Sequence, residues 1–579
     1  MAGVAARTWA PSRPKWNDRL RPEERCYMAR VVSNAPDHLT MNLFAPGMSL
    51  LHRAGLGGLA CTLKVMERQY EAGLLPKNKL PAPYQGDTPP WEIDEQTVTL
   101  RFGKPENAGK YLERLFAFGF SIRSDGLIFM PGQFHEKPAT AVLADLQAGI
   151  LLTFLQHGRV RKLETEPTTV SYEPEGDGIP GVAVSYKRCS SYKHQASWKE
   201  FVNRRGCLKT DTIGIDGPIS PGSVVRHVAY GAKTAIEDPP ERMLPLIFAM
   251  VGCLALPTNR GVAVLLVPET ENLLEFIHDR PAMTPTTAKE CRIASAADAA
   301  LQSQCRLREH PVREAMLKSR ARSLTAGSSL PGVYAMTFTS TAWATQQKTR
   351  VATIYVPPGD EQRLDRFERA LALLPTRIVC RTVTVSNGRG RSPTSTEHRE
   401  SFRADSVIRP LVAENLALGR KWYSGFSLLM TKTNPATDKP FRNQVQFERK
   451  GLHDMIKDDK MWDEAGERTL VQAVHDALRG RYGMIADENK NNQAAMKNRF
   501  SGEYDKWRLA FAGAKTANQF RTALCDLFSR AGRNRVLQQS WNQVLPMLRP
   551  ENWQHCRDLA LLALCSYQGK NTETGADID

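Results

Sequence analysis

Few side chains in this sequence could do chemistry, and the most suggestive are three histidines that each precede an aspartate. His278, His453 and His475 belong to pairs of the kind that can hold a hydrolytic metal. Such a site needs further His and Asp ligands from neighbouring helices. A polar dipeptide on a solvated face explains each pair more simply, so a nuclease with a dispersed metal site stays open only as an alternative.

Other catalytic signatures are missing from the sequence. It has no phosphate-binding G-x-x-x-x-G-K-[ST] loop, no H-E-x-x-H motif and no G-x-S-x-G elbow. The run GLGGLA at 55–60 fits a looser dinucleotide-binding pattern, but it lies in a helical pattern with no strand before it. We expect its small residues to let another backbone pack closely. We therefore predict a protein that is not an enzyme, with no catalytic residue, metal or cofactor.

Residues 186–209 combine basic and aromatic side chains. Seven basic residues stand against Glu200 alone: Lys187, Arg188, Lys193, Lys199, Arg204, Arg205 and Lys209. Arginine and lysine bind phosphates, and aromatic rings can stack on unpaired bases, so the segment is a candidate nucleic-acid contact. The alternative is a solvated amphipathic helix that Trp198 and Phe201 anchor.

A second candidate lies near the C-terminus. Residues 497–535 carry nine basic residues against Glu503, Asp505 and Asp526. Three of the arginines fall in or beside the connection between two predicted helices: Arg530, Arg533 and Arg535. A basic ridge along a helical bundle could guide single-stranded nucleic acid, and an ordinary solvated face is the alternative.

The overall charge also favours a polyanionic partner. The sequence holds 78 lysines and arginines against 61 aspartates and glutamates, a formal charge of +17. Contact with phosphate backbones is the commonest cause of such an excess in an intracellular protein. A basic protein without such a partner is the alternative.

Cysteine usage and hydropathy predict a compartment. The 11 cysteines are odd in number and none forms a C-x-x-C pair, so we expect reduced, mostly buried thiols. The longest apolar run, 243–256, is interrupted by Pro245 and Gly252, and no secretory signal opens the chain. These features predict a cytoplasmic protein with no membrane partner.

The elements that must position these residues divide the chain. At 579 residues the chain should form roughly two to four domains. Residues 1–36 are basic and proline-dotted, which predicts a flexible extension, and 37–444 predicts an irregular mixed α+β body. Strand patterns occupy 97–102, 182–186, 261–267, 332–339, 351–356 and 376–385, and helical patterns occupy 48–66, 108–118, 139–155, 290–308 and 362–374.

Beyond about 445 strand patterns fade and amphipathic helices follow one another. Apolar residues recur at spacings of three and four, which predicts an all-α bundle over 445–568 with one buried stripe per helix. Tyr482, Tyr504 and Tyr567 belong to these expected core stripes, and Pro546 should kink the helix that contains it. Residues 569–579 form a polar tail. The predicted fold class is α+β, a mixed body followed by a helical bundle.

Three stretches resemble a known family. They are NLFAPGM-x-x-LHRAGLGGLA within 38–66, the run 245–269 that ends in NRGVAVLLVPE, and SVIR at 406–409 followed by ENL and WYSGF. Each is similar to the large-subunit family of type I CRISPR Cascade complexes, in the MYXAN-subtype branch of the Cas-eight class. The stretches cover about a fifth of the chain and occur in the family's order.

The resemblance implies a non-catalytic subunit that inspects the protospacer-adjacent motif, opens the DNA duplex and helps recruit a helicase-nuclease or transposition proteins. Guide RNA pairs with the target strand, while protein reads the short motif. The implied partners are guide RNA, target double-stranded DNA and other Cascade subunits, namely the backbone, guide-5′-end, guide-processing and small subunits. The helices after 445 resemble a fused small subunit.

Within this frame we assign candidate nucleic-acid contacts. The 187–209 segment, with Asn259 and Arg260, is expected to touch the duplex, and Arg530, Arg533 and Arg535 the separated strand. A strand-flanking surface charge is the alternative for Arg260. A different RNA-guided or RNA-processing scaffold remains a rival for the whole protein, and the sequence does not separate a defensive system from a transposon-associated one.

Overall fold

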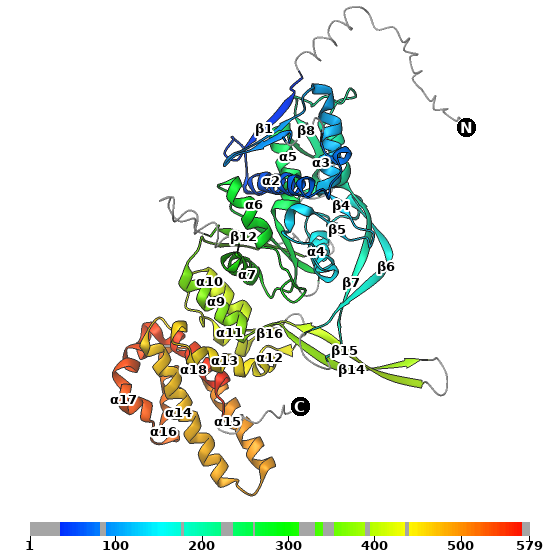
Figure 1. Ribbon diagram of the computed structural model, residues 1–579. Coiled ribbons are helices and arrows are strands. Elements are labelled where there is room, and N and C mark those ends of the chain that lie inside the picture. The colour runs from blue at the N-terminus through cyan, green and yellow to red at the C-terminus, as the bar shows by residue number, and fades with distance from the viewer. Residues whose placement is uncertain are drawn as a thin grey trace, which may run out of the picture.

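The computed structural model describes residues 35–81, 88–174, 179–221, 235–258, 261–311, 330–339, 352–387, 394–434 and 439–569. The predicted extension 1–36 and tail 569–579 therefore lie almost wholly outside the described residues. Figure 1 shows an elongated molecule with a mixed N-terminal lobe at one end and a helical bundle at the other. A long hairpin projects sideways between them.

The N-terminal lobe surrounds an antiparallel sheet of order β1-β3-β2. Its apolar core also takes in the two central helices α2 and α5. The elements of the lobe are β1 (His38–Asn42), α2 (Leu50–Glu71), β2 (Trp91–Ile93), β3 (Thr97–Arg101), α3 (Ala108–Gly119), β4 (Ser121–Ile122), β5 (Ile128–Phe129), α4 (Thr140–Leu152), β8 (Ile213–Asp216), β9 (Ala235–Asp238), α5 (Pro240–Gly252) and α6 (Leu273–Ala282).

Small residues let α2 and α5 approach until their backbones touch. A Cβ atom added at Gly55 would lie 1.9 Å from the carbonyl oxygen of Pro245, and one at Gly252 would lie 1.8 Å from that of Ala54. At Gly58 the nearest atom would be the backbone nitrogen of Gly252, at 2.4 Å. The prediction that GLGGLA serves close packing within a helix is confirmed.

A central antiparallel sheet of order β10-β11-β12-β13 has two buried faces. Side chains alternate along a strand, so Leu254 and Val264 join one apolar core while Ala255 and Leu265 join the core of the N-terminal lobe. Burial on both faces explains the unbroken apolar run of β11. The strands are β10 (Leu254–Pro257), β11 (Val262–Pro268), β12 (Val333–Thr339) and β13 (Thr353–Val356).

Two long hairpins form the third sheet, of order β14-β15-β7-β6. The sequence predicted part of β7 and β14 but neither partner strand. β15 meets β7 in parallel at one pair, Ser401 with Val182, and Arg403 anchors β15 by an ion pair of 2.6 Å with Asp145 of α4. The strands are β6 (Arg161–Tyr172), β7 (Val182–Tyr192), β14 (Arg377–Asn387) and β15 (Thr394–Ala404).

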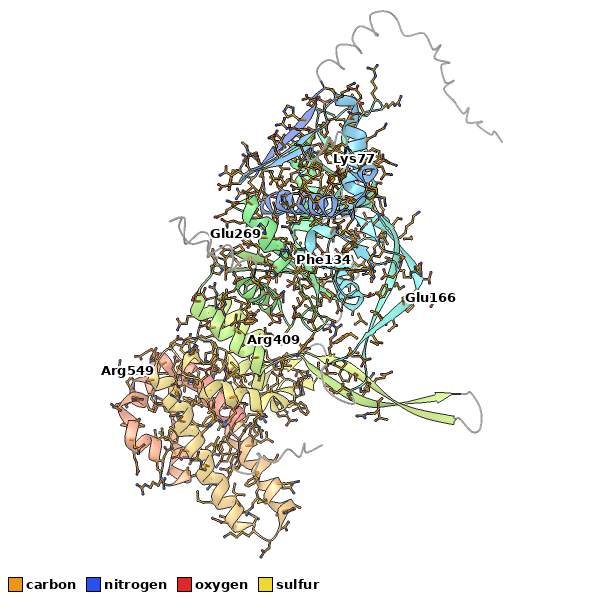
Figure 2. All side chains as sticks on the ribbon, in the orientation of Figure 1. Lys77, Phe134, Glu166, Glu269, Arg409 and Arg549 are labelled. Carbon is orange, nitrogen blue, oxygen red and sulfur yellow. The ribbon has the colours of Figure 1, made fainter. Side chains whose placement is uncertain are left out.

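Helices α7, α9, α10 and α11 join the central sheet to the bundle. Arg409, at the start of α10, lies in Figure 2 between the upper lobe and the helices below it. Its guanidinium is buried against Asp298 of α7, with 2.8 Å between Nε and Oδ1. The helices are α7 (Ala296–Glu309), α9 (Glu361–Leu373), α10 (Arg409–Ala417) and α11 (Phe426–Thr431).

The C-terminal bundle packs α15, α16, α17 and α18 around α14. Pro546 lies beyond the end of α17, in a 3₁₀ turn at Leu545–Leu548, and the kink within α17 falls at Ser540, so the predicted position of the kink is wrong. The elements are β16 (Thr433–Asn434), β17 (Lys439–Pro440), α12 (Arg442–Val445), α13 (Arg449–Lys457), α14 (Ala465–Glu488), α15 (Gln493–Gly513), α16 (Ala517–Ala531), α17 (Arg535–Val544) and α18 (Trp553–Ser566).

The α+β class, with a mixed body before a helical bundle, is confirmed. One apolar cluster continues from the central sheet through α10 into α18, so the division between 444 and 445 stays a prediction. In the described part of the chain, none of the helices combines the length and the apolar character that crossing a membrane requires. The described cysteines are free thiols, and most are buried.

Candidate nucleic-acid interface

The basic segment 187–209 begins in β7, continues through a 3₁₀ helix at Lys193–Phe201 and ends in a turn. The alternative interpretation, a helix that Trp198 and Phe201 anchor, agrees with the short 3₁₀ helix but not with the strand that precedes it. In β7 alternate side chains point inward, which buries Val184 and Tyr186 and leaves Lys187 exposed. The exposed basic side chains of the segment are Lys187, Lys193, Lys199, Arg204 and Arg205, and those of Arg188 and Lys209 are partly buried.

Local partners hold several of these cations. Lys193 and Arg159 both pair with Asp216, at 3.2 Å and 2.6 Å between nitrogen and carboxylate oxygen. Lys209 donates a 2.7 Å hydrogen bond to the carbonyl oxygen of Glu200. Arg188 donates to the carbonyl oxygen of Ser124. The structure thus adds Arg159, distant in sequence, to the basic surface.

The aromatic side chains of the segment mostly serve the core. Tyr186, Tyr192 and Phe201 are buried, so their rings are covered by protein. Trp198 is partly buried, and the ammonium of Lys199 lies 5.9 Å from its ring centroid. The interleaved rings therefore anchor the segment, and stacking of bases on Tyr186, Tyr192 and Phe201 is contradicted.

Asn259 and Arg260, the other candidate duplex contacts, lie outside the described residues. Their described neighbours belong to the end of β10 and the start of β11, where Pro257 pairs with Ala263. The assignment of both residues to duplex contact stays a prediction.

Arg530, Arg533 and Arg535 surround the turn between α16 and α17, and all three are exposed. Asn534 fixes this turn, because its side chain is buried and donates a 2.8 Å hydrogen bond to the carbonyl oxygen of Ala473 in α14. Arg530 pairs with Asp526 at 2.7 Å. The turn therefore presents three exposed arginines from a connection that Asn534 ties to α14.

The three His-Asp pairs do not assemble a metal site. Within the described ranges, no group of three His, Cys, Asp or Glu side chains is placed to hold a metal ion. His453 and His475 stack with ring centroids 6.0 Å apart, and both rings bond to the end of α18. Their role visible in the structure is to join α13 and α14 to α18.

The stability of the bundle should depend on the protonation of His475. Burial lowers its pKa to about 4, with neighbouring His453 and Arg479 adding to the effect, whereas an unfolded histidine titrates near about 6.5. The neutral form therefore stabilises the fold above about pH 6.5, and this contribution is lost as pH falls towards 4. Between about pH 7.5 and 5 we expect a loss of about 2 kcal/mol.

Chemical unfolding of the full chain at several pH values measures this effect. The His475→Gln variant removes the titrating group, so its unfolding free energy should fall less steeply with acid. If the unfolding free energies of the wild type and of His475→Gln fall equally steeply with decreasing pH, His475 does not titrate as its burial indicates.

Ser49, His52 and Asp238 form a hydrogen-bonded chain of the residue types found in serine hydrolases. Ser49 Oγ lies 2.6 Å from His52 Nδ1, and His52 Nε2 lies 3.1 Å from Asp238 Oδ2. The nitrogens are reversed relative to a catalytic triad, in which serine bonds Nε2. Ser49 is the N-cap of α2 in a reciprocal capping box. The chain therefore caps α2 and ties it to β9.

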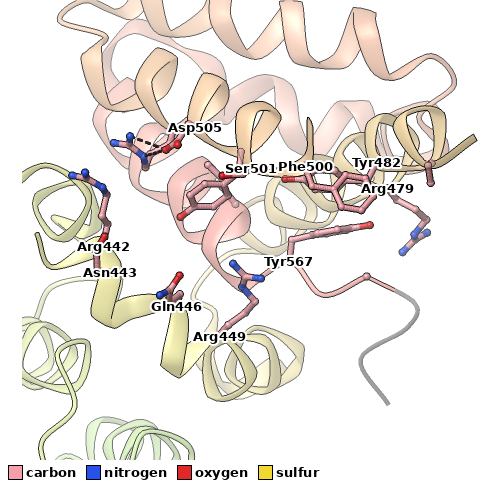
Figure 3. A pocket seen from close by; sticks show the side chains of 16 residues that line it. Arg442, Asn443, Gln446, Arg449, Arg479, Tyr482, Phe500, Ser501, Asp505 and Tyr567 are labelled. Carbon is pink, nitrogen blue, oxygen red and sulfur yellow. Dashed lines mark hydrogen bonds and ion pairs between the residues drawn. The ribbon is translucent and has the colours of Figure 1, made fainter. Parts of the chain in front are cut away.

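A cleft in the bundle gathers side chains that are scattered in the sequence. Its volume is about 930 Å³, and its walls come from α12, α13, α14, α15 and α18. Figure 3 shows arginines and aromatic rings facing this space. The charged lining residues are Arg442, Arg449, Arg479, Arg508 and Asp505, and the lining rings are Tyr482, Phe500, Tyr504 and Tyr567.

Helical periodicity alone did not reveal this cleft. It placed Tyr482, Tyr504 and Tyr567 in the core stripes, whereas the structure leaves all three partly buried at the edge of the core. The arginines come from separate helices, so no local cluster signals them. The sequence contained one signal of the cleft, namely arginines close to the tyrosines of successive helices.

Two comparisons with known proteins identify the family. DevT N-terminal domain matches residues 40–247, and DevT C-terminal domain matches residues 457–578. A CRISPR-associated protein Cas8a1/Csx13 of Myxococcus xanthus (strain DK1622) is 33% identical over 575 residues, which cover 96% of this chain and 93% of the relative. The chain belongs to the MYXAN-type Cas8 family. The resemblance seen in the three sequence stretches is confirmed.

The stretches that carry the Cas8 resemblance occupy the core of the fold. The first forms α2 and its contact with α5, and the second ends in the buried strand β11. The third contains Ser406 and Arg409, which are buried at the junction with the bundle. These family stretches therefore lie largely in the packed core. The candidate contacts of 187–209 and 530–535 fall outside the stretches, whereas Asn259 and Arg260 open the run NRGVAVLLVPE.

Proposed function

We propose that this Cas8-family chain is the large subunit of a type I CRISPR Cascade complex. The observation that carries the proposal is 33% identity to a CRISPR-associated Cas8 protein along 96% of the chain. The formal charge of +17 supports it independently, because a subunit of a ribonucleoprotein must approach phosphate backbones.

The basic surfaces at 187–209 and around the 530–535 turn support separate binding of duplex and single-stranded DNA. The 187–209 surface binds duplex DNA near the protospacer-adjacent motif, with Asn259 and Arg260 as further contacts, and the opened strand passes Arg530, Arg533 and Arg535. Guide RNA, backbone subunits, the guide-5′-end, guide-processing and small subunits are the partners, and a helicase-nuclease or transposition proteins act after target binding. The chain itself is non-catalytic and resides in the cytoplasm.

Co-purification tests the assembly. The full chain, tagged and expressed with its neighbouring genes, should bring down a repeat-derived guide RNA and other Cascade subunits in fixed proportion. Recovery of the chain alone, or with unrelated RNA, would contradict the proposal. Cutting of DNA by the purified chain with magnesium or manganese, abolished by His453→Ala or His475→Ala, would instead establish the nuclease alternative.

Neutralising exposed cations of the 187–209 surface should weaken binding to duplex DNA. The variant Lys187→Gln/Lys199→Gln/Arg204→Gln removes three charges whose side chains are exposed. Each lost phosphate contact reduces the slope of log K against log salt by about 0.9, so the slope should fall by about 2.7 if all three bind phosphate. Fluorescence anisotropy with labelled duplex across a salt series measures both affinity and slope.

A matched variant separates local contact from net charge. Lys77→Gln/Lys79→Gln/Lys137→Gln removes the same charge from exposed positions of the N-terminal half. It should retain nearly the wild-type slope, and duplex affinity of the first variant should be at least tenfold lower than that of the second. If both triple variants bind duplex DNA with the same affinity and salt slope, the 187–209 surface is not part of the interface.

A further inference from the structure

We propose that the cleft lined by α12–α15 and α18 binds an unpaired nucleotide of a single nucleic-acid strand. Two backbone phosphates flanking that nucleotide lie at Arg442 and Arg449, one at each, and the base packs on the rings of Tyr482 and Tyr567. The inference rests on the proposed function, because a chain that opens a duplex exposes unpaired strands beside its bundle. It adds a second contact for the strand, recessed in a cleft, to the exposed ridge around the 530–535 turn.

Charge makes the cleft an anion site. Two arginines of the cleft already have a carboxylate partner. Arg508 forms an ion pair with Asp505, with 2.8 Å between Nη2 and Oδ1, and Arg479 forms one with Asp476, with 3.3 Å between Nη1 and Oδ1. By contrast, Arg442 and Arg449 have no carboxylate partner among the described residues. Arg449 is positioned by a 3.2 Å hydrogen bond from Nε to the carbonyl oxygen of Cys565, which leaves both terminal nitrogens for an anion. Two guanidinium groups without a carboxylate partner, one from α12 and one from α13, suit successive phosphates of a strand.

Aromatic rings supply the surface for a base. Tyr482 and Tyr567 lie with ring centroids 5.4 Å apart at 32°, and Phe500 meets Tyr482 edge-on at 5.1 Å. All three rings are partly buried, so they are held in place and still border the open space. Figure 3 shows Tyr567 between Arg449 and the pair of Tyr482 and Phe500. Held aromatic rings beside cations are the arrangement on which unpaired bases stack.

The combination selects an unpaired strand over other anions. The bases of a duplex are stacked on each other and cannot reach rings inside a protein cleft without flipping out. The carboxylates of an acidic peptide could satisfy the arginines, but Asp and Glu side chains carry no aromatic ring to stack on the tyrosines, whereas every nucleotide joins a phosphate to a base. A free nucleotide shares the chemistry of one strand residue but makes no contacts outside the cleft.

Binding of a labelled single-stranded oligothymidylate to the full chain tests the charge component. Arg442→Gln/Arg449→Gln should lower affinity roughly tenfold and reduce the salt slope by about 1.4, since each phosphate contact on single strands contributes about 0.7. The matched control Lys490→Gln/Arg499→Gln removes two exposed cations of the same bundle, each paired with a carboxylate outside the cleft, and should bind as wild type. Equal binding by the cleft variant and the control would overturn the inference.

The base component has its own readout. An oligonucleotide with abasic sites should bind the wild-type chain roughly tenfold more weakly than the intact strand, because stacking on held rings is lost. Tyr567→Leu should narrow this difference, and photo-crosslinks from iodouracil should map to Tyr482 or Tyr567 by mass spectrometry. Equal affinity for abasic and intact strands, or crosslinks only outside the cleft, would contradict the assignment. Displacement of the strand by an equal concentration of thymidine monophosphate would show that the ligand is a free nucleotide.

Failure of this inference differs from failure of the proposed function. If the chain assembles with guide RNA but the cleft variants bind strands normally, only the cleft assignment is wrong. If the chain never assembles with guide RNA while the cleft variants lose strand binding, the cleft stands and the proposed function is wrong. The melting temperatures of Arg442→Gln/Arg449→Gln and of its control should equal that of the wild type. A loss of strand binding then reflects the cleft and not a change in the fold.

Discussion

Replacing Gly252 by alanine should destabilise the N-terminal lobe by about 3 kcal/mol or more. The added Cβ atom would lie 1.8 Å from the carbonyl oxygen of Ala54 and 2.5 Å from its carbonyl carbon. These are backbone atoms, so no side-chain rotation relieves the contact and α2 must move away from α5. Separation of the two helices would disturb the apolar core that they share.

Thermal and chemical unfolding of the full chain measure the effect. The apparent melting temperature of the lobe should fall by roughly 10 °C, given that about 1 kcal/mol shifts a domain of this size by about 2–4 °C. Gly55→Ala should behave similarly, because its Cβ would lie 1.9 Å from the carbonyl oxygen of Pro245.

Gly502 offers a matched control within the helical α15. No heavy atom lies within 4 Å of a Cβ atom built there. Gly502→Ala should therefore stabilise the protein slightly, by up to about 1 kcal/mol, because alanine favours helix. A Gly252→Ala protein that melts with the wild type would show that α2 and α5 are not in backbone contact.

Removing the carboxylate of Asp298 should cost about 3–5 kcal/mol of folding free energy. Asp298 and Arg409 are both fully buried, and the two carboxylate oxygens bond Nε at 2.8 Å and Nη2 at 3.2 Å. In Asp298→Ala the guanidinium keeps its 2.8 Å hydrogen bond to the carbonyl oxygen of Leu374 but loses its counter-charge. An unpaired buried charge is what makes the single substitution severe.

A double-substitution cycle distinguishes this cause from simple loss of contacts. Asp298→Leu/Arg409→Met removes both charges and fills similar volume, so it should recover more than half of the stability lost in Asp298→Ala. Asp365→Ala removes an exposed carboxylate that pairs with Arg308 at 3.0 Å, and it should change stability by less than about 1 kcal/mol. A double variant no more stable than Asp298→Ala would contradict the explanation.

The helices were largely predictable because their signals are local. Periods of three and four located α2, α3 and α9 within a few residues and predicted that the chain after 445 is helical. Strands were predicted where both faces are apolar, as in β11. β6 was missed because most of its side chains are exposed, so its sequence lacks an apolar alternation.

The candidate nucleic-acid interface was likewise predictable only in part. Sequence identified the basic segment 187–209, since its lysines and arginines are contiguous. It could not show that Tyr192 and Phe201 face the core, because rings that stack on bases and rings that anchor the segment give the same composition. Nor could it show that Asp216 binds Lys193 together with Arg159.

By itself, the sequence determined the α+β class, the helical end of the chain, the excess of positive charge and the family. These depend on composition and on repeats within one element, which each segment carries independently of its neighbours. The tertiary structure decided which cations are neutralised, why GLGGLA must be small, and that Asp298 meets Arg409 111 residues away. It also brought four arginines and four aromatic rings from separate helices around one cleft. Such pairings depend on how whole helices pack, and no local pattern encodes them.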